Sequence, residues 1–370
     1  MAEIHSIQYL RGLAAVAVVC FHVNQQFGGP FDVGAAGVDL FFVISGFIMW
    51  VTTSGRSTQP WRFISRRVTR IVPLYWIVTL LTASAIFLKP CFFYDHMLSP
   101  LNFFGSLVFV PVLEKGLPHP VLPQGWTLSY EMMFYLIFAL TLFLGERRRF
   151  GMVVGLLVGI SLLHFFLPMG YARALTRSLV LEFAAGIIIG RLWTEGIRLP
   201  MAAALTLACC GFLLLAGSEL LGWEAPRVLR WGVPAALIVA GAVFAERASP
   251  FRPVRLFTFL GEASYSIYLW HLLTAVTATS LALLFGVPAG LQPALIIIVS
   301  LAAPALLYLA VEKPLLRLLH PSPETERKRA APSAPSRAEG LRRSLAAWRE
   351  GTRPRQGARA ALLPAGVSVA

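Results

Sequence analysis

Long apolar segments recur along this chain of 370 residues and limit what it can fold into. A transmembrane α-helix needs about 20 mostly apolar residues to cross roughly 30 Å of hydrocarbon, and the segments here are of that size. Hydrophobic residues make up 57% of the chain, charged residues make up 14%, and the mean hydropathy is +0.69. We therefore expect an all-α integral membrane protein.

About ten transmembrane helices are predicted, separated by short polar breaks. The expected spans cover residues 7–23, 34–53, 71–88, 126–144, 152–167, 178–193, 201–221, 231–245, 260–285 and 293–311. A further apolar run at 101–113 could be an eleventh, re-entrant or interfacial segment. No small-x-small cleavage site follows the first span before further spans begin, so we expect that span to be retained rather than removed as a signal peptide.

The net charge of +14 first suggests a nucleic-acid partner, but the arginines do not form a basic face on a soluble domain. With a cytoplasmic N-terminus, the cytoplasmic loops carry thirteen Lys or Arg residues and the opposite loops carry six. This asymmetry follows the positive-inside rule, and an even number of spans returns the C-terminus to the same side. We expect both termini in the cytoplasm and no nucleic acid as a partner.

Composition divides the chain into two parts. Residues 1–319 form the predicted transmembrane domain, and residues 320–370 are rich in Pro, Ala and Arg. A segment of this composition cannot build a core, so we expect a disordered, basic cytoplasmic tail. The four cysteines, Cys20, Cys91, Cys209 and Cys210, show neither disulfide nor zinc spacing, and no metal site is expected.

Ionisable residues inside membrane spans are costly and suggest function by default. Arg11 and His22 are eleven residues apart, which places them on one face of the first helix and roughly 16 Å apart along it. Each also has a structural interpretation, Arg11 as an interfacial anchor and His22 as an interfacial hydrogen-bonding group. Taken singly, each residue fits both interpretations about equally well.

Asp39 opens the second predicted span, near the same outer surface as His22. A carboxylate beside an imidazole fixes the tautomer of the ring and stabilises its protonated form, which is an orienting role in acid–base catalysis. Asp is also common at the cap and in the first turn of a helix. On position alone, the helix-terminal role is favoured for Asp39.

The segment RFISRRVTRIVPLYW, before the third span, contains Arg66, Arg67 and Arg70. Arg67 and Arg70 are three residues apart and share a helical face, where two guanidinium groups can bind phosphates. Arginines in a cytoplasmic loop also set the topology of the chain, and spacing alone favours that simpler role.

Several later spans contain an acidic residue or a histidine. Glu131 lies about one and a half turns inside the fourth span, with Tyr135 one turn further along the same face. Glu182, His271 and Glu312 belong to the sixth, ninth and tenth spans. Each could tie two helices together, but their repetition predicts a polar interior cavity.

Six segments carry a resemblance to a known family. They read IQYLRGLAAVAVVCFHV, GVDLFFVISGFIM, FISRRVTRIVPLYW, WTLSYEMMFYLIF, LGEASYSIYLWHLL and VEKPLLRLL, in that order, and cover about residues 4–319. The chain resembles the membrane-bound acyltransferase-3 family, integral membrane enzymes that O-acylate sugars of bacterial envelope and secreted polysaccharides. With a ten-helix unit and no soluble esterase-like domain, it looks like the exopolysaccharide-modifying type.

The resemblance implies roles for particular residues. Arg11 and His22 match an arginine and a histidine of the family's first span, and the histidine is regarded there as essential for transfer. Arg67 and Arg70 match an R-x-x-R pair that is thought to engage the acyl-CoA donor. Acceptor recognition is expected in the outer segment 91–124.

The resemblance also covers two acidic residues. Asp39 matches the acidic residue of the second-span motif, and Glu131 matches the glutamate of the W-x-L-S-x-E block. The predicted catalytic residues are therefore His22, Asp39, Arg11 and Glu131, and the predicted donor-binding residues are Arg66, Arg67 and Arg70.

These residue types suit O-acyl transfer. A base must take the proton of the acceptor hydroxyl group, and a neutral histidine, with an ordinary pKa of about 6.5, suits that task. The donors that hold the developing oxyanion stay open among Arg11, Ser129 and a backbone amide. Direct transfer is preferred over an acyl-enzyme at Ser45 or Ser129, because neither serine lies in a recognisable nucleophile turn.

Together these features predict an O-acyltransferase of the bacterial inner (cytoplasmic) membrane. The expected donor is cytoplasmic acyl-CoA, with acetyl-CoA as the first candidate, and the expected acceptor is a hydroxyl group of an envelope or exported carbohydrate. Expected partners are the lipid bilayer and polysaccharide biosynthesis or export machinery. The alternative is a multi-span secondary transporter with a polar midplane cavity, but the two halves of the chain show no internal repeat.

Overall fold

The computed structural model describes residues 4–88, 99–114, 117–168 and 170–319. Its helices are α1 (His5–Gln26), η1 (Asp32–Ala36), α2 (Gly37–Thr53), α3 (Pro60–Leu88), α4 (Pro100–Leu107), η4 (Pro123–Gly125), α5 (Trp126–Thr141), α6 (Glu146–Leu163), α7 (Tyr171–Leu175), α8 (Val180–Thr194), α9 (Met201–Leu220), η5 (Val228–Gly232), α10 (Val233–Ala248), α11 (Arg255–Leu284), α12 (Gln292–Leu307), η6 (Tyr308–Glu312) and α13 (Lys313–Leu319). The strands β1 (Leu113–Glu114) and β2 (Leu117–Pro118) form one small antiparallel pair. Cys91 and the predicted tail 320–370 lie outside the described residues.

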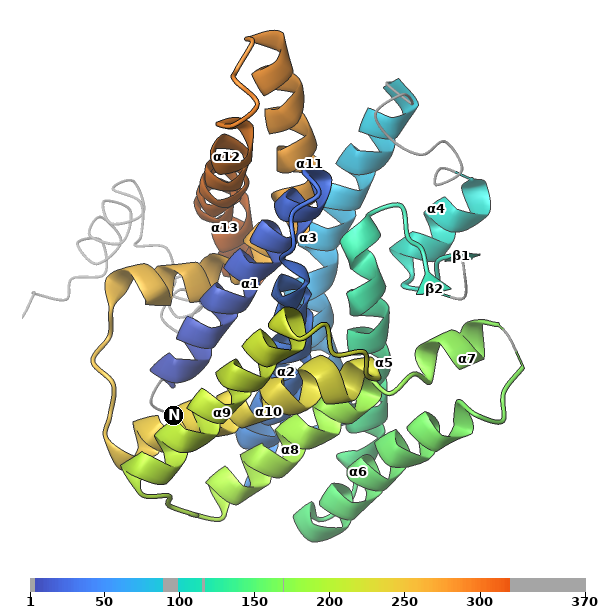
Figure 1. Ribbon diagram of the computed structural model, residues 1–370. Helices are drawn as coiled ribbons and strands as arrows, with labels where there is room; N and C mark the ends of the chain where they lie inside the picture. The colour runs from blue at the N-terminus through green and yellow to red at the C-terminus, as the bar shows by residue number, and fades with distance from the viewer. Residues whose placement is uncertain (1–3, 89–98, 115–116, 169, 320–370) are drawn as a thin grey trace, which may run out of the picture. The chain divides into compact units, whose positions relative to one another are not determined.

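The part of the chain that the structure describes is almost entirely helical (Figure 1). In the described part of the chain, seven helices are long and apolar enough to cross a membrane. Three further predicted spans coincide with α5, α6 and α8, which have 16, 18 and 15 residues and do not meet the same length and composition. The helical class is confirmed, and the count of ten spans and the sides of the termini remain predictions.

The apolar run at 101–113 does not cross the membrane. It forms α4, a helix of eight residues, which ends in a turn where Phe109 has a φ of 64°. Ser99 caps the start of α4, because its hydroxyl oxygen accepts a hydrogen bond from the backbone N–H of Asn102 at 3.2 Å. The exposed side chains of Leu101 and Phe104 leave this short helix with an apolar outer face.

α2 is the most enclosed of the apolar helices. Within the protein, 83% of its apolar window is buried, against 22% for α9. One apolar cluster joins α2 to α3, α5, α6, α8 and α11, and a second joins it to α1, α8, α9 and α10 (Figure 1). The side chains of α2 therefore face other helices on nearly every side.

Small residues allow α2 and α8 to form the most extensive helix pair in the described part of the chain. A Cβ atom at Gly46 would meet the backbone of Phe183, and one at Gly186 would meet the backbone of Val43. Glycine is common at such contacts in membranes, because it lets two backbones approach closely.

α1 and α11 also pack closely, and the two helices run in the same direction. Near their N-terminal ends, a Cβ atom at Gly261 would meet the backbone of Gln8. Near the other end of α1, Nε2 of Gln26 donates a hydrogen bond to Oγ1 of Thr279 at 3.0 Å. The same number of residues separates the two contacts on each helix, so the register of α1 along α11 is fixed at both ends.

Glutamates from distant segments bind the first amides of two helices. Glu246, on α10, accepts hydrogen bonds from the backbone N–H groups of His5 and Ser6 at 2.8 Å each. Glu219, on α9, binds the first two amides of η1 in the same way. These amides have no partner within their own helix, and the helix dipole favours a carboxylate there. The two glutamates thus fix where α1 and η1 begin.

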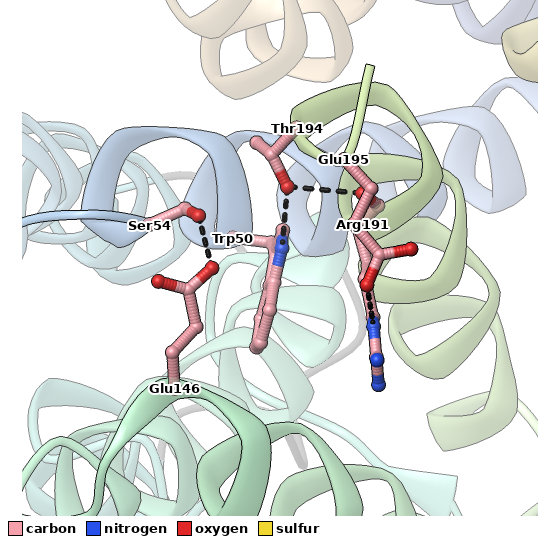
Figure 2. A network of polar contacts seen from close by, with 6 residues as sticks. All are labelled: Trp50, Ser54, Glu146, Arg191, Thr194 and Glu195. Atoms are coloured by element: carbon pink, nitrogen blue, oxygen red, sulfur yellow. Dashed lines mark hydrogen bonds and ion pairs between the residues drawn. The ribbon is translucent and has the colours of Figure 1, made fainter. Parts of the chain in front are cut away.

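Figure 2 shows how the C-terminal end of α2 is held by α6 and α8. Glu146, the first residue of α6, accepts hydrogen bonds from the hydroxyl of Ser54 and from the backbone N–H of Gly55, the latter at 2.9 Å. Trp50 Nε1 donates a hydrogen bond to Oγ1 of Thr194, on α8, at 3.1 Å. These contacts keep the last turn of α2 from sliding relative to its neighbours.

Gly261→Ala is expected to lower the thermal stability of the protein. The added methyl group would meet the backbone of Gln8, which cannot move aside as a side chain can. Overpacking of this kind costs roughly 1–3 kcal/mol, and thermal unfolding in detergent, followed by tryptophan fluorescence, measures the change.

Gly155→Ala, on α6, is the matched control. No atom lies within contact of its Cβ position, and alanine is the better helix former. Equal unfolding temperatures for Gly155→Ala and Gly261→Ala would show that α1 and α11 do not pack at this distance.

Candidate active site

A cavity of about 360 Å³ lies among α1, α2, α3, α5, α11 and η6. Its polar lining consists of Gln8, Arg11, Ser45, Arg67, Arg70, Thr127, Glu131, Tyr135, Glu262, Ser264, Tyr265, Tyr268, Tyr308 and Glu312. Of the four ionisable residues that predicted a polar interior, Glu131 and Glu312 line this cavity, whereas Glu182 and His271 are buried outside its lining.

Three guanidinium groups line this cavity, that of Arg11 from α1 and those of Arg67 and Arg70 from α3. Within the part of the chain that the structure describes, none of the three forms an ion pair. Nε of Arg67 is buried without a hydrogen-bond partner, and its guanidinium group lies 5.7 Å from the ring centroid of Phe63. Glu131, Glu262 and Glu312 line the same cavity, but none of them lies within ion-pair distance of these arginines, so the guanidinium groups can bind a ligand with several negative charges.

Glu131 lies at the centre of a second polar group in the cavity. Oε1 of Glu131 accepts hydrogen bonds from the hydroxyl groups of Tyr135 and Ser45, the latter at 3.3 Å. The two hydroxyl oxygens are 3.4 Å apart. Of the two serines considered for an acyl-enzyme, Ser45 therefore lines the cavity, whereas Ser129 is buried outside its lining.

The π-helical turn η6 brings two further cavity residues to α11. Tyr308 donates a hydrogen bond to Oε2 of Glu262 at 2.9 Å, and Oε2 of Glu312 accepts one from Ser266 at 2.6 Å. The other carboxylate oxygen of Glu312 is buried without a partner among the described residues. π-Helical turns often occur at functional sites, and this one adds a carboxylate to the same cavity as the three arginines.

Arg11 and His22 lie on one helix, as predicted, but in different surroundings. Arg11 lines the cavity and His22 does not. The ring of His22 packs against His271 of α11, with the ring centroids 5.1 Å apart. Tyr268, which does line the cavity, lies 5.9 Å from His271 by the same measure. The two imidazoles therefore adjoin the cavity through Tyr268.

Asp39 has a different partner from the predicted one. Its buried carboxylate binds Arg227, with Nε to Oδ1 at 3.2 Å and Nη2 to Oδ2 at 2.7 Å. Arg227 therefore takes the place of His22 as the partner of Asp39, since it binds both carboxylate oxygens. Asp39 lies in the first turn of α2, which matches the helix-terminal alternative.

Sequence reasoning counted Arg227 only among the charges of the outer loops. In the structure it also donates a hydrogen bond to the carbonyl oxygen of Ala35 at 3.2 Å, just before α2. Its guanidinium group lies 4.6 Å from the ring centroid of Trp231. This tryptophan, four residues later in the sequence, is the feature that could have pointed to Arg227, because an arginine and a tryptophan can form a cation–π contact.

Arg66 differs from the two arginines with which it was grouped. Its side chain is exposed and is not part of the cavity lining. Successive residues of a helix point about 100° apart, so Arg66 turns away where Arg67 faces the cavity. Of the three arginines predicted to bind the donor, Arg67 and Arg70 line the cavity together with Arg11, and Arg66 does not.

The outer segment 91–124 is described for residues 99–114 and 117–124, and the remainder lies outside the described residues. Gln124, in η4, donates a hydrogen bond through Nε2 to the carbonyl oxygen of Leu269 at 2.5 Å. The carbonyl oxygen of Gln124 accepts one from the hydroxyl of Tyr268 at 3.2 Å. The outer segment is thus bound to α11 next to His271.

Residues 4–309 match the profile of a family described as "Acyltransferase domain". The chain belongs to this acyltransferase family. The acyltransferase is 40% identical over 309 residues to the exopolysaccharide production protein ExoZ of Rhizobium meliloti, and the match covers 80% of this chain and 94% of ExoZ. Because this is a family of enzymes, the chain is assigned to the acyltransferases and the secondary-transporter hypothesis is set aside.

Two more distant relatives of the acyltransferase have longer chains. It is 25% identical over 321 residues to the peptidoglycan O-acetyltransferase OatA of Listeria monocytogenes, across 72% of this chain and 48% of OatA. It is 24% identical over 326 residues to the O-acetyltransferase OatA of Staphylococcus aureus, across 73% of this chain and 51% of that protein. The acyltransferase thus spans about half the length of each, and no solved structure matches it.

Asp39→Ala is expected to destabilise the acyltransferase, because it leaves Arg227 without its counter-charge. Breaking a buried pair costs roughly 3–5 kcal/mol, and the lower end is expected here because 27% of the Arg227 side chain is exposed. The unfolding temperature in detergent measures the loss.

The double variant Asp39→Leu/Arg227→Met removes both charges and is expected to recover part of that stability. If the Asp39→Ala protein is as stable as the wild type but has no acyl-transfer activity, the role of Asp39 is catalytic and not structural.

Proposed function

We propose that this protein transfers an acyl group, with acetyl as the first candidate, from cytoplasmic acyl-CoA to a hydroxyl group of an envelope or exported carbohydrate. The observation that carries the proposal is the set of three guanidinium groups in one cavity, without ion pairs among the described residues. The proposed location is the bacterial cytoplasmic membrane, and residues 1–319 form the acyltransferase unit, with the tail 320–370 outside it.

The donor end of the cavity is the side of Arg67 and Arg70. Both residues lie in the first half of α3, which carries most of the arginines of the segment that the positive-inside rule assigns to the cytoplasm. The phosphate groups of CoA present several oxygens that guanidinium groups bind in pairs. Arg11, from α1, then faces the same ligand from another helix.

Three carboxylates moderate this positive charge when no donor is bound. Glu131, Glu262 and Glu312 line the same cavity and are held by hydrogen bonds from Tyr135, Tyr308 and Ser266, respectively. Because charge in a membrane interior is costly, an arginine cavity without nearby carboxylates would be strained in its empty state. In this proposal the role of Glu131 is to balance charge and to hold the hydroxyl of Ser45 in place.

The acceptor class comes from the relatives. One is named as an exopolysaccharide production protein and two are named as O-acetyltransferases, one of these acting on peptidoglycan. A carbohydrate hydroxyl group is the acceptor that fits both kinds of name. Machinery for polysaccharide biosynthesis or export is the corresponding partner.

In the proposed reaction, His22 takes the proton of the acceptor hydroxyl group as its oxygen attacks the carbonyl carbon of the thioester. A carbon–oxygen bond forms and the carbon–sulfur bond breaks. The proton held by His22 then passes to the leaving thiolate of CoA. Arg11 lies roughly 16 Å from His22 along α1, so in this proposal it binds the donor in the cavity and the group that stabilises the developing oxyanion is left unassigned.

Arg67→Ala and Arg70→Ala are each expected to weaken CoA binding on the order of 10- to 100-fold, because each removes a charge-assisted contact to phosphate. Calorimetry of CoA binding to the detergent-solubilised protein measures the effect.

Arg66→Ala is the matched control, because it removes the same charge from the same helix at an exposed position. CoA affinity that is unchanged in all three variants, or lowered equally in all three, would assign these arginines to topology instead of donor binding.

A further inference from the structure

The tautomer of His271 can be assigned from its hydrogen bond. Nδ1 of His271 lies 2.6 Å from the carbonyl oxygen of Tyr268, one turn earlier on α11. A carbonyl oxygen only accepts hydrogen bonds, so Nδ1 must carry the proton in the neutral ring. With the ring neutral, Nε2 is then an unprotonated nitrogen with a free lone pair.

Nε2 of His271 has no partner among the described residues, although it is fully enclosed. The side chain is 1% exposed, and Nε2 is one of the buried polar atoms without a hydrogen bond. Leaving a buried acceptor without a hydrogen bond destabilises the folded state. A nitrogen held in this state is suited to receive a proton donor during function.

His22 is the neighbouring group that can supply that donor. Its ring centroid lies 5.1 Å from that of His271, and the two ring planes are tilted by 33°. The hydroxyl of Tyr268, another polar group beside His271, is already engaged with Thr127 at 2.9 Å and with the carbonyl oxygen of Gln124. The fixed register of α1 along α11 places His22 level with Ala275, one turn beyond His271, and the two imidazoles meet across that turn.

We propose that His271 is the positioning residue of His22. Its Nε2 accepts a hydrogen bond from one ring N–H of His22, directly or through a water molecule, and leaves the other nitrogen of His22 unprotonated toward the acceptor. When His22 takes the hydroxyl proton, the same hydrogen bond stabilises the imidazolium that forms. His271 thus fills the orienting role for which Asp39, bound to Arg227, is not free. The proposal rests on the proposed function only in naming His22 as the base.

Two substitutions separate the two nitrogens of His271. In His271→Asn, the amide group can still donate to the carbonyl oxygen of Tyr268, but nothing replaces Nε2. In His271→Gln, the longer side chain places an amide oxygen where Nε2 was, so an acceptor for His22 is retained. His271→Asn is expected to lower kcat on the order of 10²-fold with little change in the KM for the donor, and His271→Gln is expected to recover most of that loss.

Imidazole ¹⁵N NMR of the full-length protein in detergent tests the contact without any assay of transfer. The chain has seven histidines, and His22→Ala and His271→Gln assign the two signals of interest. The His22 ring signals are expected to shift in His271→Asn and to lie near their wild-type positions in His271→Gln. This readout holds even where acyl-CoA is not the donor, so failure of the proposed function and failure of this inference are distinguishable.

Three results would overturn the proposal. One is an unshifted His22 signal in His271→Asn. Another is an equal loss of kcat in the Asn and Gln variants, which would mean that His271 only fills space. The third is a loss in the double variant His22→Ala/His271→Asn that equals the product of the single losses, since two residues acting as a unit are not additive.

Discussion

A charged group inside hydrocarbon is stable only where another charge, a hydrogen bond or water meets it, and this constraint organises the interior of the acyltransferase. Asp39 and Arg227 meet it by pairing with each other. The guanidinium groups of Arg11, Arg67 and Arg70 share a cavity without ion pairs among the described residues. This difference distinguishes the cavity, as a candidate binding site, from the pair of Asp39 and Arg227, which holds two helical segments together. Nε2 of His271 is one of several buried polar atoms without a hydrogen-bond partner among the described residues, and it is the one that lies beside His22.

The positions of these groups depend on how closely the helices approach. Glycines at the contact of α2 with α8 hold α2 in the centre, where Ser45 meets Glu131 of α5. The parallel packing of α1 on α11 brings Arg11 to the cavity and His22 to His271 along one pair of helices. The donor site and the imidazole pair are therefore parts of one arrangement, and a change in helix spacing would move both.

Hydropathy and motif spacing predicted the helical class, the polar cavity and the pairing of Arg67 with Arg70 on one face, because these depend on composition and on local geometry. They did not predict the partner of Asp39, since Arg227 is 188 residues away and reaches it only through the packing of η5 beside α2. They also grouped Arg66 with its neighbours, although the helix turns it outward. His271 was visible as a histidine inside a span, but its role depends on a tautomer that only the contact with Tyr268 reveals.

The most direct measurement uses sealed membrane vesicles of known orientation that contain the acyltransferase and the host's own carbohydrate acceptor. Radiolabelled acetyl-CoA does not cross the membrane, so the side to which it is added decides whether it reaches Arg67 and Arg70. Inside-out vesicles, which expose the cytoplasmic face, are expected to incorporate label into carbohydrate, and right-side-out vesicles are expected to do so only after permeabilisation. Equal incorporation in intact vesicles of both orientations would contradict a donor site that opens to the cytoplasm.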